Sequence, residues 1–203
     1  MVDRGRFIVF EGGEGCGKST QSRRLADRIG ATWTREPGDT PLGARIREVL
    51  LDRATIASPR AEALLMAADR AQHVLDVIEP ALVAGRHVVC DRYVGSSVAY
   101  QGFGRGLDPA EVERLSMWAT RECQPDLVVL LVVPSSVSAE RLGTDLDRFE
   151  GAGSDFHERV AAGFEAQTEA DPGRWIRING VGTIDEVTER VWTSVGDRLG
   201  LQP

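Results

Sequence analysis

Short apolar runs alternate along the chain with segments of helical periodicity. The runs have strand length and cover residues 7–10, 31–34, 87–90, 127–133 and 175–178. The run at 127–133 is the most apolar, which is typical of a central strand buried on both faces. Strands that are separated by helices predict an α/β fold in three layers, a central parallel sheet flanked by helices.

The helices between these strands are marked by their start and stop signals. Ser58 followed by a proline, and the sequences that begin at Asp108 and Thr183, are typical N-caps, and Gly30 is a stop signal. Pro80 lies inside the helix that starts after Ser58 and is expected to kink or divide it. We predict helices over residues 19–29, 41–51, 59 to about 84, 109–122, 135–142, 155–168 and from 184 onward.

Composition narrows the class of protein. The 203 residues are 42% apolar and 27% charged, with a net charge of −7, and we expect one globular domain over residues 1–203. The negative charge disfavours nucleic acid as a partner, and no apolar run approaches the length of a membrane span. Three widely spaced cysteines predict neither a disulfide framework nor a zinc site and favour a reducing, cytoplasmic compartment.

A glycine-rich loop follows the first predicted strand and leads into a helix. It satisfies the phosphate-loop pattern G-x-x-x-x-G-K-[ST]. Glycines let the main chain approach phosphates, and the N–H groups and positive helix end bind the anion. We expect Lys18 to reach the outer phosphates and the Ser19 hydroxyl to bind Mg²⁺. The loop residues expected at the nucleotide are Gly12, Gly13, Glu14, Gly15, Cys16, Gly17, Lys18, Ser19 and Thr20.

Asp91 and Arg92 directly follow the predicted strand at 87–90. The carboxyl ends of parallel strands face the same ligand-binding edge, so Asp91 is expected beside the phosphate loop, where it would hold Mg²⁺ directly or through water. Arg92 is expected to grip a phosphate with both arms of its guanidinium group. A structural ion pair at a strand end is the alternative for both residues.

Several motifs, in the same order along nearly the whole chain, resemble those of the thymidylate kinases. Residues 91–101, DRYVGSSVAYQ, resemble the family signature D-R-[YH]-x-x-S-x-x-A-Y-Q, and residues 10–19 resemble its phosphate loop. Residues 34–38 resemble its T-R-E-P-G segment, residues 67–73 its A-A-D-R-A-Q-H helix and residues 147–150 its D-R-x-E. The chain is therefore identified as a member of this family.

The resemblance implies a P-loop kinase fold with a short lid, at about residues 143–154. It implies transfer of a phosphoryl group from ATP to dTMP with Mg²⁺, by a cytoplasmic enzyme that is usually a homodimer. It also implies roles for individual residues. Arg92 would hold the acceptor phosphate, Arg70 would contact the thymine edge, and Tyr100 would pack under the deoxyribose. The residues implied at dTMP are Glu14, Arg35, Pro37, Met66, Arg70, Arg92, Ser97, Tyr100 and Gln101.

The lid is expected to supply a further cation. In the family, a phosphate loop without an arginine tends to accompany an arginine in the lid, and position 15 of this chain is glycine. The candidates are Arg141 and Arg148, and we favour Arg148 because it stands in the matching D-R-x-E. An arginine that a closing loop brings in stabilises the transferring charge and helps to exclude water.

The chain departs from the family pattern at two positions of the acceptor side. Met66 stands where a phenylalanine usually stacks on thymine, and Phe164 replaces a common tyrosine. Because of these departures, two alternatives to a dTMP kinase stay open. One is a nucleoside-monophosphate kinase with a shifted acceptor, and the other is a nucleotide-binding protein that has lost transfer activity. The presence of Lys18, Ser19 and Asp91 argues against the second alternative.

Overall fold

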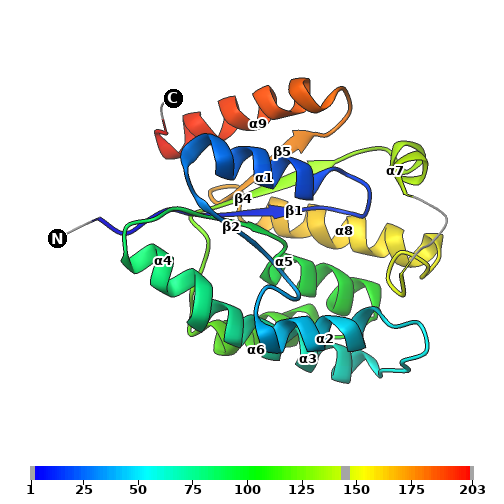
Figure 1. The fold of residues 1–203 in the computed structure, drawn as a ribbon. Coiled ribbons are helices and arrows are strands. Elements are labelled where there is room, and N and C mark those ends of the chain that lie inside the picture. The colour runs from blue at the N-terminus through cyan, green and yellow to red at the C-terminus, as the bar shows by residue number, and fades with distance from the viewer. Residues whose placement is uncertain (1–2, 143–146, 202–203) are drawn as a thin grey trace.

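The computed structural model describes residues 3–142 and 147–201, and its centre is a five-stranded sheet (Figure 1). All strand pairs are parallel, and the order is β2-β3-β1-β4-β5. The expected parallel α/β architecture is confirmed. The strands are β1 (Phe7–Glu11), β2 (Thr32–Arg35), β3 (Val88–Asp91), β4 (Leu127–Val132) and β5 (Trp175–Asn179).

Helices cover both faces of the sheet (Figure 1). Alternate residues of β1 point to opposite sides. Ile8 and Phe10 pack against α1 (Lys18–Ile29) and α9 (Ile184–Leu199), whereas Phe7 and Val9 belong to the core on the other face. The second face carries most of the remaining helical segments, among them α2 (Pro41–Leu51), α3 (Pro59–His73), α4 (Glu79–Val83), α6 (Pro109–Thr120) and α8 (Ser154–Ala170).

The helix caps follow the sequence signals closely. The Thr183 hydroxyl accepts a hydrogen bond from the Glu186 N–H, and the Glu186 side chain accepts one from the Thr183 N–H, which completes a capping box at α9. The Ser58 side chain caps α3 by accepting from the Ala61 N–H, and the Asp108 side chain caps α6 by accepting from the Ala110 N–H, each with proline at the first helical position. The predicted starts of these three helices are confirmed.

Pro80 does not end the long helical stretch, but it follows directly on a change in the type of helix. Helix α3 passes without interruption into η1 (Val74–Ile78), a stretch of π-helix, and then into α4, in which Pro80 occupies the first turn. A wider π turn before the proline re-registers the backbone, so the missing N–H of Pro80 falls where a helix start tolerates it. The stretch is therefore divided just before the proline.

The segment after Asp91 is helical, which the sequence signals did not reveal. It forms α5 (Val94–Ser97) and then η2 (Val98–Gly104), a second stretch of π-helix packed against α8. Its small residues permit this close packing, since a Cβ at Gly104 would lie 2.6 Å from the ring of Phe156. Wide helical turns of this kind are frequent at functional sites.

The ends of the chain and one internal stretch are outside the described residues. The predicted lid at about residues 143–154 falls partly there, since residues 143–146 are not described. The described part of the lid is a turn at 148–152 that leads into α8, preceded by the short helix α7 (Ser135–Arg141). Within the described residues, no helix combines the length and apolar character that a membrane span requires.

Candidate active site

The phosphate loop joins β1 to α1 and packs against the end of β4 and against α7. Gly12 has φ +143°, and a Cβ there would lie 2.4 Å from the carbonyl oxygen of Leu131. A Cβ at Gly15, with φ +67°, would lie 2.8 Å from the carbonyl oxygen of Ser138. Both positions therefore require glycine. Lys18 is almost fully buried at the start of α1, and its Nζ donates to the Gly13 carbonyl oxygen at 2.7 Å.

Asp91 faces the phosphate loop because β3 pairs with β1. Phe10 and Asp91 are partners in the register, so the end of β3 lies beside the start of the loop. The Ser19 hydroxyl donates to Asp91 Oδ2 at 2.5 Å, whereas the buried Oδ1 has no hydrogen-bond partner. An unpartnered carboxylate oxygen beside a serine hydroxyl fits Mg²⁺, which prefers oxygen ligands and retains phosphate and water oxygens. Asp91 and Ser19 thus form the oxygen-rich corner that the sequence predicted.

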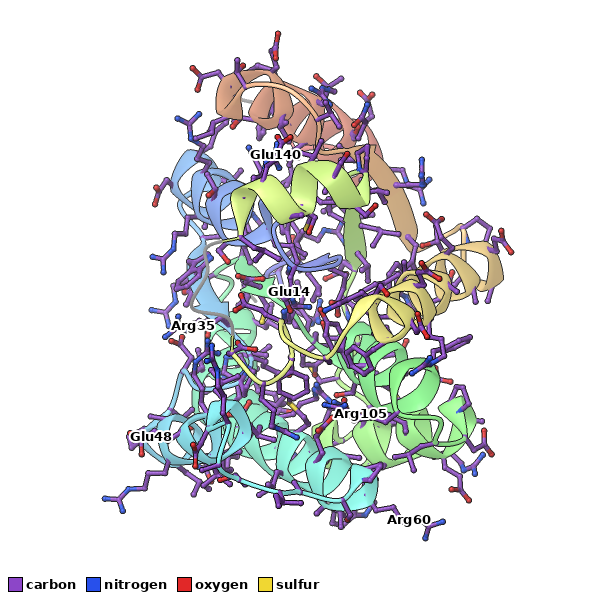
Figure 2. All side chains as sticks on the ribbon, turned by 90° about the vertical axis from the view of Figure 1, so that its right-hand side faces the viewer. Glu14, Arg35, Glu48, Arg60, Arg105 and Glu140 are labelled. Atoms are coloured by element: carbon purple, nitrogen blue, oxygen red, sulfur yellow. The ribbon has the colours of Figure 1, made fainter. Side chains whose placement is uncertain are left out.

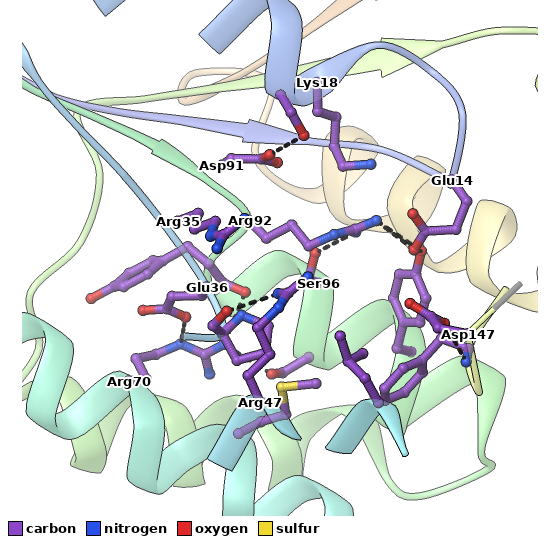
Figure 3. A pocket seen from close by; sticks show the side chains of 18 of the residues that line it. Glu14, Lys18, Arg35, Glu36, Arg47, Arg70, Asp91, Arg92, Ser96 and Asp147 are labelled. Atoms are coloured by element: carbon purple, nitrogen blue, oxygen red, sulfur yellow. Dashed lines mark hydrogen bonds and ion pairs between the residues drawn. The ribbon is translucent and has the colours of Figure 1, made fainter. Parts of the chain in front are cut away.

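Arg92 takes a backbone conformation that places its side chain across the mouth of the loop. Its φ is +70°, and its N–H donates to the Phe10 carbonyl oxygen. Nη2 donates to Glu14 Oε1 at 2.6 Å and to the Tyr100 hydroxyl at 3.2 Å, and Tyr100 itself donates to Glu14 (Figure 3). Positive φ at a non-glycine residue is a strained arrangement that surrounding contacts must hold, and it is frequent at functional sites.

The charges in this cluster are mutually stabilised. Burial raises the pKa of Glu14, but Arg92 and Lys18 together outweigh it and lower the pKa to about 2. Burial by itself would lower the pKa of Arg92, but Glu14 and neighbouring groups raise it well above its ordinary value. Figure 2 shows Glu14 in the middle of the molecule, whereas Glu48 and Arg60 lie at its periphery. The site therefore holds a fixed positive charge at neutral pH.

Glu11, the last residue of β1, supports Arg92 from behind. Its Oε1 accepts from the N–H groups of Tyr93 and Ser96 at 3.0 and 2.9 Å, and its Oε2 accepts from the Ser96 hydroxyl at 2.6 Å. The same hydroxyl accepts from Arg92 Nη1 at 3.0 Å. Burial raises the pKa of Glu11 to about 7. Sequence reasoning missed this residue, although an acidic residue inside an apolar strand is itself a signal.

One cavity of about 270 Å³ joins the phosphate loop to the layer of α2 and α3 (Figure 3). Most of the residues predicted from the sequence at dTMP or at the phosphates line it. These are Glu14, Lys18, Ser19, Arg35, Pro37, Met66, Arg70, Asp91, Arg92, Ser97, Tyr100 and Gln101. The structure thus brings together residues from positions 14 to 101 of the chain.

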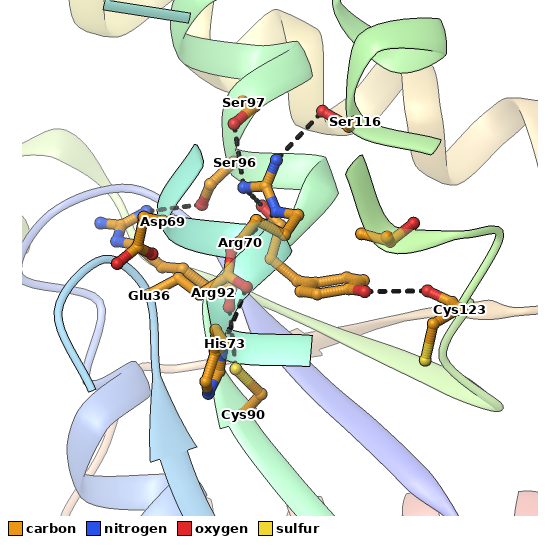
Figure 4. A network of polar contacts seen from close by, with 12 residues as sticks. Glu36, Asp69, Arg70, His73, Cys90, Arg92, Ser96, Ser97, Ser116 and Cys123 are labelled. Carbon is orange, nitrogen blue, oxygen red and sulfur yellow. Dashed lines mark hydrogen bonds and ion pairs between the residues drawn. The ribbon is translucent and has the colours of Figure 1, made fainter. Parts of the chain in front are cut away.

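Arg70 reaches the cavity from α3 and is held by an extended polar network (Figure 4). Nε donates to Glu36 Oε2 at 2.7 Å, Nη1 to the Ser116 hydroxyl at 3.0 Å, and Nη2 to the Ser97 hydroxyl at 3.0 Å. Nη2 also donates to the Tyr93 carbonyl oxygen at 3.0 Å. These bonds use four of the five N–H donors of a guanidinium group and fix its plane.

Glu36 ties the loop after β2 to α3. Its second oxygen lies 3.0 Å from His73 Nδ1, and the neighbouring Gly38 N–H donates to Asp69 at 3.0 Å (Figure 4). Burial, with a further contribution from the charge of Glu36, raises the pKa of Asp69 to about 6. Sequence reasoning assigned no role to Glu36 or Asp69, although both stand in segments that carry the family resemblance.

Two further arginines line the cavity near Arg92. Arg35 is the last residue of β2, one position beyond the predicted strand, and lines the cavity. Arg47 of α2 donates from Nη1 to the Pro37 carbonyl oxygen at 2.9 Å. Burial and the charge of Arg35 lower the pKa of Arg47. Sequence reasoning missed Arg47. Its signal is the position, since Arg47 shares the buried face of α2 with Gly43 and Leu50 at helical spacing.

The structure places the two candidate lid arginines differently. Arg141 lies against the phosphate loop, where Nη1 donates to the Gly15 and Cys16 carbonyl oxygens at 3.3 and 3.4 Å, and Nη2 donates to the Gly180 carbonyl oxygen. Arg148 lies away from the loop, with its Nε on the Leu50 carbonyl oxygen at 2.8 Å. Arg141 is thus the arginine that contacts the phosphate loop in this structure.

The remaining predicted residues belong to the loop or its first turn. Cys16 is buried, and its sulfur lies 3.7 Å from Lys18 Nζ, whereas Thr20 is exposed on α1. Phe164 is buried, with its ring 6.2 Å from that of Tyr100. It therefore packs behind Tyr100 and is not among the residues that line the cavity. Gly12, Gly13, Gly15 and Gly17 form the loop backbone.

Comparisons with known proteins agree with this geometry. A family model described as thymidylate kinase matches residues 10–191. The thymidylate kinase of Synechococcus sp. (strain JA-2-3B'a(2-13)) is 47% identical over 200 residues, which cover 96% of each chain. That of Cutibacterium acnes (strain DSM 16379 / KPA171202) is 48% identical and covers 92% of this chain and 94% of that protein.

A solved structure gives the same result. The crystal structure of thymidylate kinase from Ehrlichia chaffeensis matches with a TM-score of 0.80 and 28% identity, over 95% of this chain and 99% of that one. With its phosphate loop, its matching family segments and these relatives, this chain belongs to the thymidylate kinase family, which phosphorylates dTMP.

Proposed function

We propose that this chain transfers the γ-phosphoryl group of ATP to dTMP and releases dTDP and ADP. One observation carries the proposal. A single cavity is lined both by Lys18 and Ser19 of the phosphate loop and by Arg70, Ser97 and Gln101, which offer polar groups to a base. A donor phosphate at the loop and an acceptor nucleotide in the cavity would then meet at Arg92.

The chemistry asks mainly for positioning and for neutralised charge. Arg92, Arg35 and Arg47 surround the place of the acceptor phosphate, and Lys18 stands at the donor side. With both anions held in line, the developing charge on the transferring group faces fixed cations, which need no reorganisation during reaction. Glu14 keeps Arg92 oriented through its bond to Nη2 and lies with Tyr100 on the sugar side.

The acceptor base lies, in this proposal, between α3 and η2. Arg70 donates to the carbonyl oxygen at C4 of thymine, and Met66 packs its polarizable sulfur on the ring face. Ser97 stands beside Arg70, and the Tyr100 ring lies under the deoxyribose, where it crowds a 2′-hydroxyl. Pro37 closes the cavity at the side of the loop after β2.

Mg²⁺ fits the corner formed by Ser19 and Asp91. The described residues contain no cluster of three or more His, Cys, Asp or Glu that would bind a metal alone, so phosphate and water oxygens complete the set. When bound, Mg²⁺ neutralises charge on the β- and γ-phosphates. Asp91 Oδ1, which lacks a protein partner, is the oxygen available to it or to its water.

Arg141 and Arg148 have separate tasks in this proposal. Arg141 braces the phosphate loop on the ATP side through the Gly15 and Cys16 carbonyl oxygens. Arg148 is ion-paired with Glu62 at 2.8 Å, so it would have to leave this partner before it reached a phosphate. The family pattern still favours Arg148 as a cation of the closed lid. The kinetics of Arg141→Ala and Arg148→Ala distinguish the two roles.

We further propose a cytoplasmic homodimer built from one domain over residues 1–203. Leu64 of α3 and Trp118 of α6 are 57% and 78% exposed, on two helices that pack against each other. Apolar exposure of this size favours a second copy of the chain as the cover. The free cysteines Cys16, Cys90 and Cys123 support a reducing compartment. Light scattering at several concentrations tests the dimer.

The decisive test is ADP formation from ATP and Mg²⁺ with dTMP, dUMP, dCMP and dGMP in turn. We expect rapid turnover with dTMP and much slower turnover with the others. Turnover with a different acceptor would show that Met66 and Phe164 shift the specificity. No turnover with any acceptor, together with thermal stabilisation by ATP, would show a nucleotide-binding protein without transfer activity.

A further inference from the structure

Glu62 of α3 is a fully buried carboxylate that the proposed mechanism does not use. Its Oε1 accepts from Gln101 Nε2 at 2.8 Å and lies 3.2 Å from Arg105 Nε. Its Oε2 lies 2.8 Å from Arg148 Nη1, an ion pair without the alignment of a hydrogen bond. Both oxygens are therefore engaged, and the carboxylate has no freedom to turn.

The contact with Glu62 decides which way the amide of Gln101 points. A carboxylate flanked by two arginines only accepts hydrogen bonds, so the NH₂ group of Gln101 must face it and the carbonyl must face away. Gln101 is fully buried and lines the cavity, and its Oε1 has no hydrogen-bond partner. A buried acceptor without a donor costs free energy, which a ligand with an N–H group at this place recovers.

We propose that Glu62 is a specificity-determining positioning residue, which fixes Gln101 as a hydrogen-bond acceptor for the base. This inference rests on the proposed function, because it needs a pyrimidine in the cavity. Thymine has an N–H at ring position 3, beside the C4 oxygen assigned to Arg70. Gln101 Oε1 accepts from this N–H directly or through one ordered water. Cytosine has an unprotonated nitrogen there, so two acceptors would oppose each other.

Discrimination between thymine and cytosine by their hydrogen-bond patterns is well suited to a buried polar site. A site built for one hydrogen-bond pattern rejects an analogue with the opposite pattern, because its buried polar groups are then left unpaired. Glu62 touches no substrate in this arrangement. Its effect passes through the amide of Gln101, and Arg105 and Arg148 hold the carboxylate in place for that purpose.

The test compares dTMP with 5-methyl-dCMP, since these two acceptors differ only at positions 3 and 4 of the ring. We would measure kcat and KM for both with the wild type, Glu62→Met, Gln101→Met and the double variant. In Glu62→Met the amide of Gln101 is free to turn. We expect kcat/KM for dTMP to fall about tenfold through KM, and the preference for dTMP over 5-methyl-dCMP to shrink by a similar factor.

The double variant separates positioning from general damage. If Glu62 acts through Gln101, Glu62→Met causes no further loss of preference in the Gln101→Met background. A preference that is unchanged in Glu62→Met, or that falls equally in both backgrounds, overturns the inference. A merely structural loss would lower kcat/KM for both acceptors alike and leave their ratio unmoved.

A second measurement does not depend on Glu62→Met being folded. In the wild type, the imino proton at position 3 of bound dTMP should exchange slowly with water and give an observable NMR signal. In Gln101→Met this proton should exchange rapidly and the signal should be lost. Equal protection in both proteins overturns the inference. If the wild type does not phosphorylate dTMP at all, the proposed function fails instead, and the two failures are distinguished.

Discussion

The phosphate loop and the acceptor cavity meet at Arg92, yet they are built in opposite ways. The loop is one run of consecutive residues, 12–19, and its glycines, its lysine and its helix start create the anion site locally. The cavity takes Arg35 from β2, Arg47 from α2, Arg70 from α3 and Gln101 from η2. Its geometry exists only when these separate elements have packed.

The two regions also differ in how far their hydrogen bonds contribute to the stability of the fold. Lys18 donates to two groups of its own loop, the Gly13 carbonyl oxygen and the Cys16 sulfur, and is poised for a ligand. Arg70 makes four hydrogen bonds, which reach two other helices, α5 and α6, and the loops after β2 and β3. A substitution of Lys18 should therefore cost activity with little effect on folding, and a substitution of Arg70 should cost both.

Lys18→Ala should have the largest effect on activity. Removing the cation at the donor phosphates is expected to lower kcat by about 10³-fold, because residues 12–19 of the loop contain no other lysine or arginine. The melting temperature should stay close to that of the wild type. Steady-state kinetics and a thermal melt of the same preparation check both expectations, and near-normal kcat would contradict the assigned role.

Arg70→Met, in the cavity wall, should have its largest effect on stability. It leaves Glu36 buried beside His73 without its arginine, which costs about 3–5 kcal/mol of the free energy of unfolding. Urea unfolding of the variant measures this loss. Arg70→Lys is the matched control, since it keeps the charge but loses the planar fork and should recover only part of the stability. An unaltered free energy of unfolding in Arg70→Met would show that the network carries little.

The two glutamates around the loop should respond to pH with opposite signs. The folded pKa of Glu11 is about 7 against an ordinary 4.5, so its contribution to stability is complete below pH 4.5 and is lost as pH rises to about 7. The folded pKa of Glu14 is about 2, so its contribution is complete above pH 4.5 and is lost as pH falls toward 2. Each slope is at most about 1.4 kcal/mol per pH unit.

Urea unfolding between pH 2.5 and 8 measures these slopes. Glu11→Gln has no carboxyl to titrate and should lose the decline between pH 4.5 and 7, while the decline on the acid side remains. Glu14→Gln should do the reverse. A Glu11→Gln protein with the full wild-type decline would assign that titration to another group, such as Asp69, whose pKa burial raises to about 6.

Arg141→Ala and Arg148→Ala should give the smallest effects on activity. We expect the first to affect the phosphate loop and the second to affect the acceptor cavity. We expect Arg141→Ala to raise KM for ATP about tenfold, because Arg141 braces the loop carbonyls. Arg148→Ala should act mainly on KM for dTMP, through the loss of its ion pair with Glu62. A fall in kcat of more than about a hundredfold in Arg148→Ala would instead identify it as the cation of the closed lid.

Much of the fold was predictable because its signals are local. The caps at Ser58, Asp108 and Thr183 and the apolar runs of the strands gave the elements and their order, and the structure confirms them. The helical segment at 94–104 escaped prediction, because its glycines and polar residues resemble a loop in sequence. Packing against α8 and α6 makes its wide turns favourable.

The candidate site divides in the same manner. The phosphate loop and the Asp91–Arg92 pair follow from the sequence, since a strand end and a glycine run bring their own geometry wherever they occur. The roles of Glu11, Arg47 and Glu62 do not, because each depends on contacts with another element. Glu11 and Glu62 contact the distant residues Ser96 and Gln101, and Arg47 of α2 reaches back to Pro37.

The sequence by itself thus determined the anion-binding loop, the succession of strands and helices along the chain, and the family. The tertiary structure decided which charges meet. It pairs Glu36 with Arg70 and Glu14 with Arg92. It also pairs Arg148 with Glu62, and not with the phosphate loop. The physical reason is that a local backbone conformation depends on neighbouring residues, whereas a buried ion pair depends on the packing that excludes water around both partners.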